Sequence, residues 1–382
     1  MTMANTIYMN NAATGWPKFD ASLEAMSESL RNGVMSANRD SIGIEDAQTM
    51  IFNLRTMLGN MMHAKEPHEI ILTPSDTIAI NMILHGMDWH FGDIILVDDM
   101  AHNAAARPTW RLIVDEMVQV SYIHDADDVR KAIHRKGFNK VKACICTHAS
   151  NVTGDVMDIE AIGEVCKDND ILFILDAAQS LGVVDVDVEK VHASAVAFAG
   201  HKVLNGPQGT GGFYLRKGFD IKPSLWGGTG NESVSIDPST VYPDSFEVGT
   251  PAMHDLIGLY YAVKEIEERL GRDLYARKLR ELGQHAYDAL SALPNVILYG
   301  DERKQTPVVS FNVKGYQASE VGEHLGKYGI VCRTGVHCAG LAHKRLGTID
   351  AYGGTVRVSF GWFNSVEHIT ALIDALKELP EK

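Results

Sequence analysis

The run SAVAFAGHKVLNGPQGTGGFYL, residues 194–215, decides how this sequence folds. It begins and ends with short apolar stretches, Ser194–Ala199 and Gly211–Leu215, and the glycine-rich loop between them carries Lys202. Short runs that are almost entirely apolar are typical of strands covered on both faces. We therefore predict two buried strands, with a lysine directly after the first.

Apolar stretches alternate with helical ones on the N-terminal side of this run. Helical segments such as Thr77–Met87 and Ile159–Lys167 separate the expected strands. Such alternation predicts an α/β fold, in which a mainly parallel sheet has helices on both faces. The other predicted strands are Glu69–Thr73, Ile94–Val97, Val141–Thr147 and Ile171–Asp176.

The pattern changes after Pro251, where long amphipathic helices and an α+β region are expected. A chain of 382 residues exceeds a single comfortable core, so we expect two domains. We predict a large domain over residues 15–260 and a smaller one formed by residues 261–382 together with residues 1–14. The predicted elements of this part are helices Leu256–Leu270 and Leu274–Leu293 and strands near Val308–Val313 and Val356–Phe360.

The composition and charge of the chain indicate which classes of protein it can belong to. Hydrophobic residues make up 45% and charged residues 22% of the chain, which is ordinary for a globular protein. The net charge of −14 argues against nucleic acid and anionic membranes as partners. No apolar run is long enough to span a bilayer, and the N-terminus lacks the pattern of a secretory signal. The five cysteines are expected to be reduced thiols, and the protein cytoplasmic.

Lys202 and Asp176 both follow predicted strands, and ligands of parallel sheets bind beyond the carboxyl ends of the strands. A partly desolvated lysine has a lowered pKa and can form a Schiff base. A buried Asp176 needs a positive partner, which a protonated pyridine nitrogen supplies. We therefore predict pyridoxal 5′-phosphate as cofactor, carried as a Schiff base on Lys202. The plainer alternatives are an exposed loop lysine and an aspartate that caps a helix.

Other polar residues near these strand ends could complete the site. His102 could stack on the cofactor ring, and Gln179 and Asn151 could reach the ring oxygen. Ser75, Asp76 and Thr77 begin a helix, where phosphate is commonly bound. The alternative for each is a structural role, which for residues 75–77 is plain helix capping. Because a carboxylate would repel phosphate, we expect Asp76 to cap the helix and point away.

The C-terminal part adds candidates for substrate binding and catalysis. Arg357 has an inward-facing strand position, and its planar guanidinium suits an amino-acid carboxylate. Cys338 lies in a glycine-bracketed loop beside His337 and near Arg333, the electropositive surroundings in which thiolates become nucleophilic. A structural ion pair and an inert thiol are the alternatives. No metal is expected, since the cysteines and histidines lack zinc-finger spacing.

Seven motifs, spread along nearly the whole chain, resemble the class V aminotransferase-fold enzymes, in the group of cysteine desulfurases and selenocysteine lyases. The resemblance implies a fold-type I enzyme with a seven-stranded sheet, and a homodimer with shared active sites. The short loop around Cys338 resembles a subgroup that often needs a separate sulfur-acceptor protein. The motifs are YMNNAATGWPK (8–18), THASNVTG (147–154), DAAQSLG (176–182), GHKVLNGPQGTGG (200–212), FEVGTPA (246–252), RTGVHC (333–338) and RVSFGWFN (357–364).

The resemblance also implies roles for single residues. Lys202 would form the Schiff base and Cys338 would take sulfur as a persulfide, while Arg357 would bind the substrate carboxylate. The residues implied to hold the cofactor are Asp176 at the pyridinium, Gln179 and Asn151 at the phenolic oxygen, His102 on the ring, and His201, Thr77 and the other subunit's Thr250 at the phosphate. The chain departs from the family pattern at Asp76, Ala101, Ala199 and the residues after Cys338.

The favoured function is conversion of L-cysteine to L-alanine with sulfur held on Cys338. The alternatives on the same scaffold are a selenocysteine lyase or another C–S lyase without an obligatory persulfide. A nicotinamide-dependent dehydrogenase is disfavoured, because no G-x-G-x-x-G follows a strand and opens a helix. A metal-binding module built on Cys332, His337, Cys338 and His343 is disfavoured by their spacing.

Overall fold

The computed structural model describes residues 6–33, 44–136, 140–229, 234, 236 and 242–380. No helix in these ranges is long and apolar enough to cross a membrane. The strands are β1 (Ile7–Tyr8), β2 (Ile70–Thr73), β3 (Ile94–Asp98), β4 (Gln119–Ile123), β5 (Val141–Thr147), β6 (Leu172–Asp176), β7 (Ala195–Ala199), β8 (Gly211–Leu215), β9 (Val296–Tyr299), β10 (Val308–Val313), β11 (Ile330–Val331), β12 (Arg333–Gly335) and β13 (Thr355–Ser359). The helices are α1 (Asp20–Asn32), α2 (Ile44–Met61), η2 (Pro67–Glu69), α3 (Asp76–Gly86), α4 (Asn103–Glu116), α5 (Ala126–Lys136), α6 (Ile159–Asp168), α7 (Met253–Lys264), η3 (Glu265–Leu270), α8 (Arg272–Ser291), α9 (Ala318–Lys327), α10 (Gly340–Leu346), α11 (Thr348–Tyr352) and α12 (Val366–Lys377).

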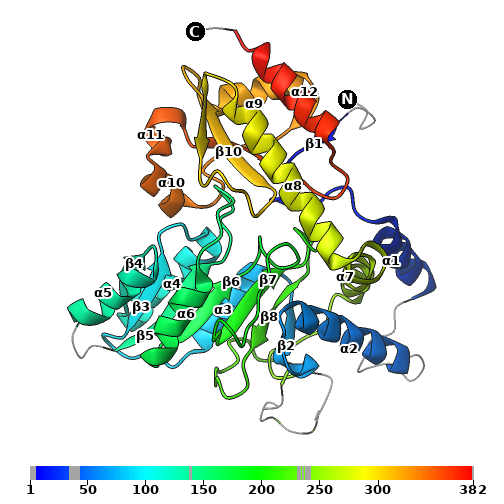
Figure 1. Cartoon of the computed structure of the whole chain (residues 1–382). Coiled ribbons are helices and arrows are strands. Elements are labelled where there is room, and N and C mark those ends of the chain that lie inside the picture. The colour runs from blue at the N-terminus through cyan, green and yellow to red at the C-terminus, as the bar shows by residue number, and fades with distance from the viewer. Residues whose placement is uncertain are drawn as a thin grey trace.

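A seven-stranded sheet with the order β2-β8-β7-β6-β5-β3-β4 forms the centre of the molecule (Figure 1). Strands β7, β6, β5, β3 and β4 are parallel, and β8 runs antiparallel to both of its neighbours. The mainly parallel α/β sheet predicted from the sequence is thus confirmed. Strand β4 escaped prediction because it lies at the sheet edge, where its side chains are mostly exposed or half-buried and lack a continuous apolar run.

Helices cover both faces of this sheet. Successive residues of a strand point to opposite faces, so Ile94 and Leu96 of β3 join one apolar cluster and Ile95 and Val97 the other. The first cluster includes side chains of α2, α6 and α7, and the second includes side chains of α3 and α4. Polar side chains at the carboxyl edge are therefore the groups left to face a ligand.

The C-terminal part carries an antiparallel sheet of order β12-β13-β10-β9, packed against α8, α9 and α12 (Figure 1). The N-terminal strand β1 pairs in parallel with β11, which fastens the start of the chain to this part. Through this pairing the described N-terminal residues contact the C-terminal part, and the assignment of residues 1–14 to that part stays a prediction. The division of the chain near residue 260 stays a prediction, because α7 and the first residues of α8 still contribute to the core beneath the large sheet.

A turn after β5 joins the large sheet to the C-terminal part. Lys304, whose side chain is fully buried, donates from Nζ to the Thr153 carbonyl at 3.0 Å and lies 3.2 Å from an Asp155 carboxylate oxygen. Thr306 donates from Oγ1 to the Gly154 carbonyl at 2.7 Å. Gly154 has φ of +77°, and a Cβ there would lie 2.3 Å from the Val308 carbonyl oxygen. Only glycine permits this close approach.

Replacing Gly154 by alanine tests whether this joint stabilises the fold. Gly92 has a similar φ of +82° but no atom within 4 Å of an added Cβ, so it is the matched control. Gly92→Ala should cost about 1 kcal/mol of backbone strain, whereas Gly154→Ala should cost about 3 kcal/mol because a clash is added. Thermal scans should show the larger drop in melting temperature for Gly154→Ala. Equal drops for the two variants would mean that the close contact contributes nothing.

Candidate functional site

The strands β3, β5, β6 and β7 deliver polar residues to one end of the large sheet. A pocket of about 200 Å³ lies there, and residues from the C-terminal sheet close its other side. Asp176 lies at the end of β6 beneath this group and is 4% exposed. The structure therefore brings together residues that are far apart in sequence. The predicted site residues that line the pocket are Asp76, Thr77, His102, Asn151, Gln179, His201, Lys202, Arg333 and Arg357.

Lys202 is the only lysine among the residues that line this pocket. Burial lowers the pKa of its ammonium, and the carboxylates of Asp76 and Asp176 oppose that shift. Burial raises the pKa of Asp176, while the Lys202 ammonium and a 3.0 Å hydrogen bond from the Ala178 N–H oppose it. A lysine with a lowered pKa has more of the neutral amine that attacks a carbonyl carbon.

Asp76 was expected to cap α3 and to point away from the pocket, and the structure shows neither. Ser75, not Asp76, caps α3, because its Oγ accepts from the Ile78 N–H at 3.2 Å. The Asp76 side chain lines the pocket and is 7% exposed. The prediction that Asp76 points away was therefore wrong. Ser75 already occupies the capping position, so Asp76 falls in the first turn of the helix, where its carboxyl group enters the pocket.

Two histidines at the pocket are held as neutral rings. The Nδ1 atom of His102 accepts from the Ala104 N–H at 3.1 Å, which places His102 at the start of α4. Burial lowers the pKa of His102 to about 3 and that of His201 to about 4, with Lys202 adding to both shifts. Neutral imidazoles can stack on a ring or accept and donate hydrogen bonds without adding charge.

Two arginines face each other across strands β12 and β13. Arg333 and Arg357 are direct partners in the antiparallel register. Arg357 is fully buried and donates to the Asn151 carbonyl at 2.8 Å and to Oδ1 of Asn10 at 3.1 Å. Burial, followed by the Arg333 charge, lowers the pKa of Arg357 to about 9. Like charges directly opposite one another favour an anion between or beside them.

Cys338 lies next to this arginine pair. Its Sγ is 3.2 Å from Nη2 of Arg333, and its carbonyl accepts from the Asn103 N–H at the start of α4 at 2.8 Å. Asn151 donates from Nδ2 to the neighbouring His337 carbonyl at 2.8 Å. Both His337 and Cys338 have positive φ, +48° and +59°. The thiol is therefore held against the large sheet by contacts to its own backbone.

His337 does not support the thiol in the way the sequence suggested. Its ring is buried and its Nε2 lies 2.9 Å from the Thr355 hydroxyl. Burial and the charge of Arg357 lower its pKa to about 2, so the ring carries no positive charge. The expectation of an electropositive loop holds for Arg333 and not for His337. Sequence proximity alone misled here, because His337 and Cys338 lie in a turn with left-handed backbone, where neighbouring side chains point in different directions.

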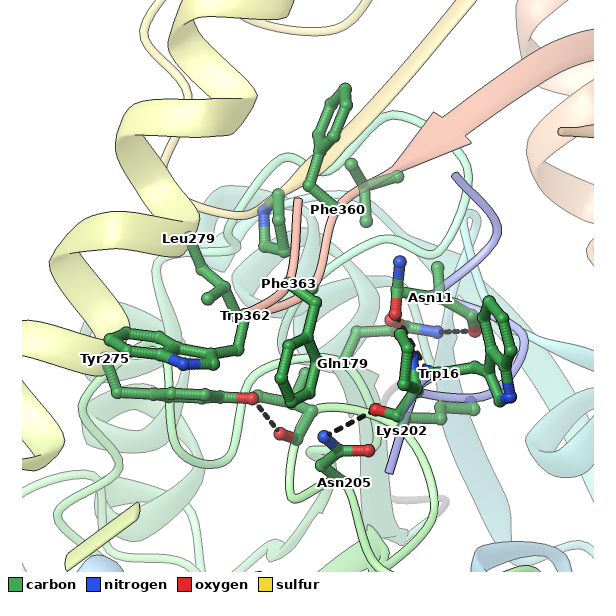
Figure 2. A pocket seen from close by; sticks show the side chains of 17 residues that line it. Asn11, Trp16, Gln179, Lys202, Asn205, Tyr275, Leu279, Phe360, Trp362 and Phe363 are labelled. Atoms are coloured by element: carbon green, nitrogen blue, oxygen red, sulfur yellow. Dashed lines mark hydrogen bonds between the residues drawn. The ribbon is translucent and has the colours of Figure 1, made fainter. Parts of the chain in front are cut away.

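Aromatic residues of the C-terminal part pack behind Lys202, as Figure 2 shows. Tyr275 and Trp362 stack with ring centroids 5.7 Å apart, and the Tyr275 hydroxyl donates to the Val203 carbonyl at 2.6 Å. The Tyr275 bond thus holds the backbone that follows Lys202. Gln179, which lines the pocket shown in Figure 2, donates from Nε2 to the Ala12 carbonyl at 2.8 Å.

Two residues of this region were not singled out from the sequence. Asn10 accepts from Arg357, and Lys18 donates from Nζ to the carbonyls of His201 and Gly206 at 3.1 and 2.6 Å. Burial lowers the pKa of Lys18 to about 8. Both lie in the YMNNAATGWPK run, where polar residues are mixed with the aromatic residues Tyr8 and Trp16. This mixture was the signal in the sequence that could have pointed to them.

Several polar atoms around the pocket still lack a partner. Within the described residues, Oδ1 of Asp76, Oδ1 of Asn151, Nδ1 of His201 and Nε of Arg357 are buried and make no hydrogen bond. Buried polar groups normally have partners, so these atoms indicate a polar ligand.

Thr250 is exposed and is not among the residues that line the pocket. In the described part of the chain, no group of three or more metal-binding side chains occurs.

Comparisons with known proteins agree with this geometry. The sequence profile of the class-V aminotransferases matches residues 7–372. A probable cysteine desulfurase of Pyrococcus abyssi is 32% identical over 98% of this chain and 94% of its own length. The apo structure of a cysteine desulfurase from Thermococcus onnurineus NA1 has a TM-score of 0.89 and 31% identity, over 98% of this chain and 94% of that one.

A more distant solved structure shares the fold. It is a mutant of C-DES, a cystine C–S lyase, with glycine covalently linked to its PLP cofactor. It has a TM-score of 0.83 and 22% identity, over 98% of this chain and 97% of that one. With a profile match that covers nearly the whole chain, and with relatives similar over its full length, the chain belongs to the class-V aminotransferase family.

Proposed function

We propose that the protein is a cysteine desulfurase that uses pyridoxal 5′-phosphate, converts L-cysteine to L-alanine and holds the sulfur on Cys338. The observation that carries this proposal is the position of the Cys338 thiol. It contacts Arg333, which pairs in register with Arg357, and both arginines line the pocket of Lys202. A thiol, a carboxylate-binding pair and a reactive amine thus meet in one place. Full-length relatives named cysteine desulfurase support the same proposal.

The residues of the pocket fit the cofactor. Lys202 would carry it, and Asp176 would hold a proton on its pyridine nitrogen. His102 would lie on the ring, Gln179 and Asn151 near the phenolic oxygen, and the start of α3 with Thr77 and His201 around the phosphate. When bound, the cofactor supplies an electron sink for the substrate carbon.

The remaining chemistry falls to the side chains of the protein. Arg357, with Arg333 beside it, would bind the substrate carboxylate and orient its sulfur toward Cys338. The Cys338 thiolate attacks that sulfur, a sulfur–sulfur bond forms, and the carbon–sulfur bond breaks with its electron pair left on carbon. The Lys202 amine would move the proton that completes alanine.

We further propose a cytoplasmic homodimer with shared sites and a separate sulfur acceptor. Thr250 is exposed and lies outside the pocket of its own chain, and in this proposal it reaches the phosphate in the other subunit's site. The outer faces of α3 and α4 carry exposed apolar side chains that a second copy would cover, namely Ile78, Trp110, Ile113, Val114 and Met117. Cys338 is partly exposed, as transfer of sulfur to an acceptor requires.

Borohydride reduction tests the cofactor and its lysine. The protein purified with pyridoxal 5′-phosphate should be yellow, and reduction should fix the cofactor on Lys202, whose pKa is lowered. Lys18 is the rival, since its pKa is also lowered, but its Nζ is held by two backbone carbonyls. Peptide mapping that places the label on Lys18, or an absent chromophore, would refute the assignment.

Arg357→Lys tests the carboxylate site while keeping the positive charge. Lysine cannot reproduce the two-pronged hydrogen bonding of a guanidinium, so kcat/KM for cysteine should fall roughly 100-fold. The absorbance of the bound cofactor should change little, because the Arg357 guanidinium contacts only the backbone carbonyl of Asn151, not the side chain proposed to lie near the phenolic oxygen. Unchanged kcat/KM would place the substrate carboxylate elsewhere.

Cys338→Ala separates a desulfurase from a lyase without an obligatory persulfide. Without the thiol, alanine formation from cysteine should drop to nearly nothing, because the nucleophile is gone. Selenium leaves carbon more readily, so much of the reaction with selenocysteine should survive. Cys332→Ala is the control, since burial raises the pKa of Cys332 to about 11 and keeps that thiol neutral. Full activity of Cys338→Ala on cysteine would favour the lyase.

A further inference from the structure

Asp76 is a buried carboxyl group that the proposed mechanism does not use. It lines the pocket at the first residue of α3 and is 7% exposed, and its Oδ1 is buried without a partner among the described residues. Ser75 already caps the helix. The carboxyl is therefore not explained by the local structure of the helix, and it faces the place where the helix start would meet a phosphate.

The surroundings of Asp76 are unusual for a phosphate site. A phosphate close to neutral pH carries nearly two negative charges, and an ionised Asp76 beside it would repel it. Ala199, which lines the same pocket, offers no hydroxyl to the phosphate. A protonated carboxyl in this place would resolve both difficulties, because it has no charge and can donate a hydrogen bond.

The neighbouring groups favour the protonated form. Burial raises the pKa of Asp76 strongly, and the carboxylate of Asp176 at the end of β6 raises it further, while the Lys202 ammonium lowers it. His201, after β7, and His102, at the start of α4, have pKa values of about 4 and 3, so neither ring changes charge near neutral pH. Arg357 of the C-terminal sheet, whose pKa is about 9, stays positive near neutral pH, and Arg333 lies opposite it in the register. A bound phosphate would add another negative charge to this set.

Resting on the cofactor proposed above, we propose that Asp76 binds the phosphate group of the cofactor as a neutral carboxylic acid. It would donate a hydrogen bond where a hydroxyl is missing. Binding then requires a proton on Asp76, so the affinity for the phosphate should fall as pH rises above the pKa of Asp76 in the cofactor-free protein. Asparagine has the same shape and also donates, but it does not titrate.

The test compares the affinity for pyridoxal 5′-phosphate of the wild type, Asp76→Asn and Asp76→Ala between pH 6 and 9. At pH 6 the wild type and Asp76→Asn should bind alike, and Asp76→Ala about 10-fold more weakly for want of a donor. Toward pH 9 the wild type should lose affinity relative to Asp76→Asn. Asp76→Asn shares the titration of the phosphate with the wild type, but it lacks the Asp76 charge that raises the pKa of Lys202, so a reference ligand without the phosphate is needed.

Pyridoxal, which lacks the phosphate, is the matched ligand, and the affinity of each protein for pyridoxal 5′-phosphate is divided by its affinity for pyridoxal at the same pH, which removes the effect of Asp76 on Lys202. Two results would overturn the proposal. The first is that Asp76→Asn binds the phosphate ester at least 10-fold more tightly than the wild type, by a constant factor from pH 6 to 9, which would mean an ionised carboxylate. The second is that all three proteins agree at every pH, which would mean no contact. Failure of the proposed function would look different, since then no protein would bind the cofactor on Lys202.

Discussion

The electrostatic balance around Lys202 constrains the rest of the site. An ammonium and two carboxyl groups, those of Asp76 and Asp176, lie together in surroundings that penalise charge. Each charge is costly without the others, so the three must be placed by rigid elements. Asp176 lies at the end of β6, Asp76 at the start of α3 and Lys202 in the loop after β7. Hydrogen bonds from Lys18 and Tyr275 hold that loop.

The second constraint is the joint between the two sheets. The proposed chemistry requires Cys338 at a fixed distance from Lys202, yet Cys338 belongs to the C-terminal part. The Asn151 side chain and the Asn103 N–H bind the backbone of residues 337 and 338, and Arg357 binds the Asn151 carbonyl. Asn151 therefore contacts both the thiol loop and the arginine. A change in how the two parts dock would move the nucleophile and the carboxylate site together.

Positively charged side chains and carboxyl groups lie on different sides of the pocket. Arginines 333 and 357 lie on the side of Cys338, and the carboxyl groups lie at the base and at α3. An amino acid with its negative carboxylate would be drawn to the arginine side, which leaves its amino group toward Lys202. Because His102 and His201 are neutral, they add no positive charge that would weaken this separation.

The sequence by itself determined the α/β class, the strands of the buried sheet and the positions of Lys202 and Asp176 at strand ends, because apolar runs and their period are local properties. It also identified Arg333, Arg357 and Cys338 as candidates. Tertiary structure alone decided which way side chains point and which distant groups meet. The edge strand β4 lacks an apolar run, His337 turns toward Thr355 rather than toward the thiol, and Asn10 reaches Arg357 across the whole chain. Asp76 lies inside the pocket because Ser75 takes the cap, and its burial depends on β7 and β8 packing against α3. Burial and pairing of polar groups are set by segments far apart in sequence, and no local pattern encodes them.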